Sequence, residues 1–93
     1  MSIEEYDYPK PTAPFPYTMR TTSVLEHSRG IMWVATLLRD GEEIGEIEQM
    51  GDGGPDRVII DDAQDRALWD EHIKSAFDSE ESATFYLLCE EEG

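Results

Sequence analysis

An Asp-Gly pair between two strand-like stretches constrains the fold of this chain more than any other feature. Residues 31–39 form a predominantly apolar run, and Asp40-Gly41 follows it directly. A two-residue type I′ turn needs positive φ at both central residues, and Asp and Gly are among the residues that accept this conformation most readily. We therefore expect residues 42–50 to return as the second strand of an antiparallel hairpin.

Both faces of the first hairpin strand are apolar. Residues at alternating positions form the two faces, which are Ile31, Trp33, Ala35 and Leu37 on one side and Met32, Val34, Thr36 and Leu38 on the other. A strand of this kind is typical of a central position with cover on both sides, so we expect both faces to be covered. The N-terminal arm, the C-terminal segment and a second subunit remain as alternatives for covering the second face.

The returning strand departs from strict alternation. Ile44 and Ile47 are three residues apart, which would place them on opposite faces of a regular strand. Gly45 between them indicates a β-bulge that turns both isoleucines toward the core.

The rest of the chain predicts two further strands and a helix. Residues 17–28 are rich in β-branched side chains, and residues 57–60 form a short fourth strand. After Asp61 or Asp62 as an N-cap, apolar residues recur at helical spacing and predict a helix that ends near Asp78. The apolar stripe consists of Trp69, Ile73, Ala76 and Phe77.

The two ends of the chain are less regular. Four prolines within residues 1–16 exclude a helix or a central strand there, so we expect an extended arm that packs loosely, with partner docking as the alternative. Residues 83–89 fit either a strand or a second helix, since periodicity does not decide so short a run. Residues 90–92, three glutamates, suit a solvated tail. The prediction is one α+β domain over 17–93, a three- to four-stranded antiparallel meander on one helix.

The sequence contains no pattern of residues that indicates catalysis, a metal site or a cofactor. His27, His72 and Cys89 lie in separate segments, and three such ligands are too few for a structural zinc site. The glycine-rich loop at residues 51–56 lacks the Lys and Ser/Thr of a P-loop, and the acids around it lack EF-hand spacing. We therefore expect a protein that is not an enzyme and that needs no cofactor.

The excess of acidic residues is the strongest compositional signal. The chain has 22 Asp and Glu against 7 Lys and Arg, for a net charge of −15. Such a charge repels nucleic acid and anionic lipid and attracts basic protein surfaces. We expect no direct nucleic-acid or membrane binding. A single cysteine, Cys89, and an N-terminal segment unlike a signal peptide predict a cytoplasmic protein.

One stretch resembles small, mostly uncharacterised proteins of phages, prophages and mobile elements. About a quarter of the chain carries the resemblance, in the pattern Trp33-x-Ala35-x-Leu37-x-x-Asp40-Gly41-x-x-Ile44-Gly45-x-Ile47-x-x-x-Gly51-x-Gly53-Gly54-Pro55. The likeness supplies no catalytic residues. It implies a mobile-element accessory protein, a class that includes small acidic inhibitors of bacterial defence systems.

These observations lead to two functional hypotheses. The first is an acidic binding protein that occupies the basic cleft of a nucleic-acid-handling partner by polyanion mimicry. Its expected contacts are surface carboxylates in the second half of the chain, namely Asp61, Asp62, Asp65, Asp70, Glu71, Asp78, Glu80 and Glu81. The alternative is a small structural or housekeeping domain, with a homodimer left open, whose acidity serves solubility or adaptation to high salt.

Overall fold

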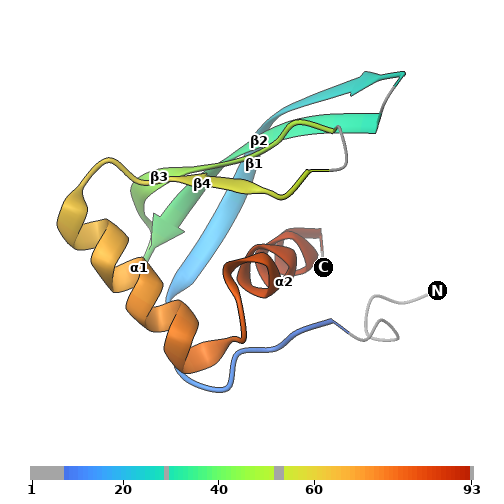
Figure 1. Cartoon of the computed structure of the whole chain (residues 1–93). Helices are drawn as coiled ribbons and strands as arrows, with labels where there is room; N and C mark the ends of the chain where they lie inside the picture. The colour runs from blue at the N-terminus through green and yellow to red at the C-terminus, as the bar shows by residue number, and fades with distance from the viewer. Residues whose placement is uncertain (1–7, 29, 52–53, 93) are drawn as a thin grey trace.

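In the described residues, four strands follow one another in an antiparallel meander, and two helices come after them (Figure 1). The computed structural model describes residues 8–28, 30–51 and 54–92. Its elements are β1 (Tyr17–His27), β2 (Gly30–Arg39), β3 (Glu42–Gln49), β4 (Arg57–Ile59), α1 (Ala63–Ala76) and α2 (Glu80–Glu92). The strand order is β1-β2-β3-β4, which confirms the predicted α+β meander.

The predicted Asp-Gly hairpin is present between β2 and β3. Asp40 and Gly41 have φ values of 52° and 83°, the positive values that the turn requires, and the flanking Arg39 and Glu42 pair across the strands. Only residues that tolerate positive φ close such a turn without strain.

The β-bulge predicted at Gly45 is confirmed. The pairing register of β2 and β3 shifts between Leu37 and Leu38, so Gly45 lies opposite Leu37. Ile47 is fully buried, and Ile44 is partly buried against the same core. A Cβ on Gly45 would lie 2.3 Å from the Ile59 carbonyl oxygen. The absence of a side chain at Gly45 therefore also allows the end of β4 to lie close to β3.

The first helix follows the sequence prediction closely. The Asp62 carboxylate accepts hydrogen bonds from the backbone N–H groups of Gln64 and Asp65, which makes Asp62 the N-cap. Trp69 and Ile73 of the predicted stripe are buried, and the helix ends at Ala76.

The ambiguous C-terminal segment is helical. Within α2, Ala83 and Leu87 lie four residues apart and both point into the core, so one face of the helix is buried. The solvated tail expected at residues 90–92 is a wrong prediction, because the helix continues to Glu92. Glu90 accepts a hydrogen bond from the Tyr8 hydroxyl, which ties this end of the helix to the arm.

Both helices cover the same face of the sheet. They bury a core made of Tyr17, Met19, Ala35, Leu37, Ile47, Trp69, Ile73, Ala83 and Leu87. Figure 1 shows the helices and the arm on one side of the strands. The expected cover on both faces of β2 is therefore wrong for the described residues. On the other face, Thr36 pairs across the strands with the exposed residues Arg20 and Glu46.

The described part of the arm packs firmly against the helices. The Thr12 backbone N–H donates to the carbonyl of Ala76 at 3.0 Å, and Tyr8 is 9% exposed. The Phe15 ring lies 4.9 Å from the rings of Tyr17 and Phe77. The loose tail expected for the arm is thus wrong from Tyr8 onward, because its aromatic rings complete the core. Residues 1–7 of the predicted arm lie outside the described residues.

Shortening one buried side chain in α2 tests how much this helix contributes to the core. Leu87 is 1% exposed, whereas Phe85 on the same helix is 50% exposed. We expect Leu87→Ala to lower the free energy of unfolding by about 2–5 kcal/mol and Phe85→Ala to lower it by less than about 1 kcal/mol. Urea unfolding followed by tryptophan fluorescence measures both. Equal losses would contradict the placement of α2.

Candidate functional site

Carboxylates gather where the β2–β3 turn meets the start of α1. The Arg39 guanidinium donates to the Asp65 carboxylate at 2.8 Å and joins the end of β2 to the first turn of α1. Glu43, Glu46 and Asp61 line one shallow groove of about 360 Å³. We define the acidic end as Asp40, Glu42, Glu43, Glu46, Asp61, Asp62 and Asp65. All of these residues except Asp65 are exposed.

Two of these carboxylates are engaged within the protein. Asp65 pairs with Arg39, and Asp62 accepts the two N–H groups of the helix cap at 2.9 and 3.0 Å. Within the described residues, the other members form no ion pair; they are Asp40, Glu42, Glu43, Glu46 and Asp61. Five exposed negative charges therefore lack a counter-ion among the described side chains.

The structure separates the eight contact residues that the sequence predicted. Asp61, Asp62 and Asp65 lie at the acidic end, at the start of α1. The others follow along α1 or at its junction with α2; they are Asp70, Glu71, Asp78, Glu80 and Glu81. The eight carboxylates are thus spread from the start of α1 through its middle, at Asp70 and Glu71, to the residues beyond its end.

Two of the remaining predicted contacts serve the fold. Arg66 lies 3.5 Å from the Asp70 carboxylate and 3.3 Å from that of Glu80. The Glu80 carboxylate also accepts a hydrogen bond of 2.8 Å from the indole N–H of Trp69. Glu80 thus joins the start of α2 to the middle of α1.

The sequence did not lead us to predict that carboxylates of the β2–β3 hairpin belong to the acidic end. Asp40, Glu42 and Glu43 lie at the β2–β3 turn, and Glu46 follows on β3. The sequence contained the information needed to place these residues together, because the Asp-Gly turn determines where they lie. Their proximity to Asp61 depends on β4 returning beside β3, which the sequence indicated only weakly.

A buried tyrosine connects the acidic end to the core. Tyr17 is 3% exposed, its hydroxyl lies 2.9 Å from Nδ1 of His72, and its ring meets that of Trp69 edge-on at 4.9 Å. Burial raises the pKa of the Tyr17 hydroxyl above its ordinary value, although the nearby Arg39 acts in the opposite direction. The neutral hydroxyl is therefore the form that the fold favours.

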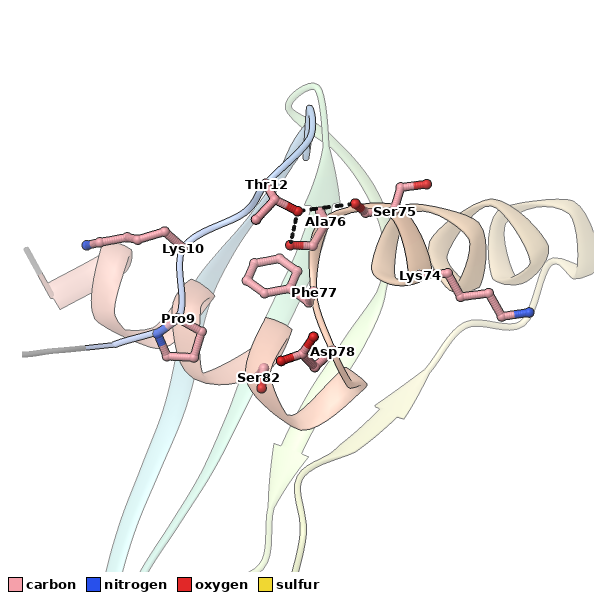
Figure 2. A pocket seen from close by; sticks show the side chains of 9 residues that line it. All are labelled: Pro9, Lys10, Thr12, Lys74, Ser75, Ala76, Phe77, Asp78 and Ser82. Carbon is pink, nitrogen blue, oxygen red and sulfur yellow. Dashed lines mark hydrogen bonds between the residues drawn. The ribbon is translucent and has the colours of Figure 1, made fainter.

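A separate pocket of about 300 Å³ lies between the arm and the junction of the two helices (Figure 2). Lys10 and Lys74 line it, but Figure 2 shows their ammonium groups pointing away from each other. Lys10 instead lies over the Tyr8 ring, 3.2 Å from its centroid, and Thr12 bonds to backbone carbonyls. These side chains hold the arm in place and do not converge on a ligand.

Within residues 8–28, 30–51 and 54–92, no group of three or more His, Cys, Asp or Glu side chains is arranged to hold a metal ion. No helix in this part of the chain is long and apolar enough to cross a membrane. No protein-family profile, curated protein or solved structure matches the chain.

Removing the Tyr17 hydroxyl should change how stability depends on alkaline pH. A raised pKa in the folded state stabilises the fold fully below the unfolded value of about 10, and this contribution is lost as the pH rises through the folded value. We expect Tyr17→Phe to cost about 1 kcal/mol at pH 7 and to flatten the fall in stability above pH 10. Urea unfolding from pH 7 to 11 measures this. Part of the fall in stability that remains in this variant comes from Tyr86, because burial also raises the pKa of its hydroxyl. An unchanged slope would show that Tyr17 does not contribute.

Proposed function

We propose that this protein is a non-enzymatic binding protein whose acidic end contacts a basic surface on another protein. The observation that carries the proposal is a group of five exposed carboxylates without counter-ions among the described residues. Four belong to the β2–β3 turn and β3, and Asp61 lies between β4 and α1. Carboxylates that have no internal partner can form charge-assisted hydrogen bonds with Arg and Lys of a partner.

The geometry of the acidic end suits a cleft that normally holds phosphates. The turn at Asp40 and the groove lined by Glu43, Glu46 and Asp61 bring exposed carboxylates to one end of the sheet. A net charge of −15 steers the chain toward a positive cleft and makes the association rate fall as salt increases. The proposed mechanism is occupation of a nucleic-acid-binding cleft by carboxylates in place of phosphates.

The proposed partner is a nucleic-acid-handling protein. The resemblance of the β2–β3 region to mobile-element proteins supports the narrower proposal of an inhibitor of a bacterial defence complex. That resemblance is an association between sequences, so the narrower proposal depends on it alone.

Acidity that serves only solubility or salt adaptation is the competing proposal. It is favoured by exposed carboxylates outside the acidic end, such as Glu71, Asp78 and Glu81. Under this proposal, stability rises as salt screens the repulsion, and every carboxylate contributes to a similar extent. A comparison of two surfaces with equal charge therefore separates the two proposals.

Two triple variants with the same change in charge test the proposed function. The first neutralises the acidic end with Glu43→Gln, Glu46→Gln and Asp61→Asn. The control neutralises the other group with Glu71→Gln, Asp78→Asn and Glu81→Gln. The probe is the protein that the wild-type chain captures from its host at 50 mM NaCl, after purification. We expect at least a tenfold loss of affinity for the first variant, equivalent to about 1.4 kcal/mol, and less than about a threefold loss for the control.

A competition assay tests the mimicry directly. Wild-type protein should displace a fluorescent oligonucleotide from the captured partner, and the first triple variant should not. Circular dichroism and urea unfolding check that both variants are folded. Equal losses in the two triple variants would favour a general charge effect, and no loss in either would rule out the acidic end as the contact surface.

A further inference from the structure

The outer part of the β1–β2 hairpin extends beyond the helices (Figure 1). In β1, burial alternates from Tyr17 to Thr21, but every residue from Thr22 to His27 is exposed. Among the described residues, three of the five most exposed large apolar side chains lie here; Val24 is 64%, Leu25 53% and Ile31 52% exposed. We call this outer part, Thr22–His27 with the β2 residues that pair with it, the hairpin extension. It presents apolar surface that the protein's own core does not cover.

The exposed apolar residues occupy both faces of the extension. Val24 pairs across the strands with Trp33, and Leu25 pairs with Met32, so successive β1 residues present apolar groups on opposite faces. A two-stranded ribbon without a covering layer is marginally stable in water. Association with another chain would stabilise this part of the sheet.

The outer edge of β1 is available for strand pairing. β1 is the terminal strand of the sheet, and the Glu91 carboxylate of α2 accepts hydrogen bonds from the backbone N–H and the hydroxyl of Thr21. Beyond this contact, the segment Thr22–Glu26 has no neighbouring strand on its outer side among the described residues. It contains neither Lys nor Pro, the residues that commonly protect an edge strand.

The distribution of charge indicates what this edge binds. Residues 17–34 contain one acid, Glu26, and two arginines, whereas the rest of the chain contains 21 acids and 5 bases. A second copy of the chain therefore meets strong repulsion at the acidic end and along the helices, and weaker repulsion at the hairpin extension. An edge strand is also self-complementary when two copies meet antiparallel about a two-fold axis.

We propose that the protein forms a two-fold homodimer by antiparallel pairing of the Thr22–Glu26 edges of two β1 strands. This pairing joins the two four-stranded sheets into one continuous sheet. Leu25 and Val24 of each copy then lie beside β1 of the other copy. The acidic ends lie at the opposite end of β2 from the pairing edge, so the dimer carries them at its two extremes. If the proposed function also holds, the dimer offers two binding surfaces to one partner assembly.

Mass measurement across concentration tests the dimer. Analytical ultracentrifugation from about 1 µM to 500 µM should show the mass of the wild-type chain rising from 10.6 kDa toward twice that value. Higher salt should tighten the dimer because it screens the repulsion between copies. Leu25→Glu should leave the protein monomeric at every concentration, since the two-fold axis brings the new charges together. The matched control is Met50→Glu, because Met50 is 50% exposed but lies outside β1.

The outcomes separate this proposal from the proposed function. The acidic-end triple variant should still dimerise, and Leu25→Glu should keep its affinity for a single basic site. Slower amide exchange at Thr22–Glu26 in wild-type protein than in Leu25→Glu would support edge pairing. A wild-type chain that is monomeric up to 500 µM would overturn the proposal. So would a dimer that Met50→Glu disrupts and Leu25→Glu does not, or a hairpin extension that binds only a different protein.

Discussion

The structure depends on the burial of two helix faces against one face of a small sheet. Trp69 on α1 and Leu87 on α2 meet Leu37 and Ile47 of the strands in a single core, and Phe15 of the arm adds a ring to it. A chain of 93 residues has little apolar area beyond this core, so apolar burial must outweigh the repulsion among 22 acids here. Within residues 8–28, 30–51 and 54–92, no layer covers the other face of the sheet or the hairpin extension.

The few basic residues are used where they connect elements. Arg39 joins β2 to α1 through Asp65, and Arg66 joins α1 to α2 through Glu80. Because these guanidinium groups pair with internal carboxylates, the remaining acids at the β2–β3 turn have no ion pair in the part of the chain that the structure describes. Residues 17–34 contain one acid, so a weakly charged, apolar hairpin extension lies at the opposite end of β2 from the acidic end.

Local rules predicted the elements whose cause is local. The positive φ angles at Asp40 and Gly41, the bulge at Gly45 and the Asp62 cap each follow from the chemistry of one or two residues. The candidate site was predictable only in part. Asp61, Asp62 and Asp65 are neighbours on one helix start, but Glu43 and Glu46 join them through the return of β4 beside β3, which depends on pairing between segments.

The meander, the first helix and the net charge could be predicted from the chain alone, because turn chemistry, periodicity and composition depend on residues close together in sequence. That residues 83–89 are helical follows from tertiary packing. Ala83, Thr84 and Leu87 are all buried, whereas the adjacent residues 83 and 84 would point to opposite faces of a strand. Tertiary packing also decided that Tyr8 to Pro16 pack against the helices and that both helices take the same side of the sheet. These outcomes depend on which apolar surfaces meet, and no local pattern in the chain specifies that choice.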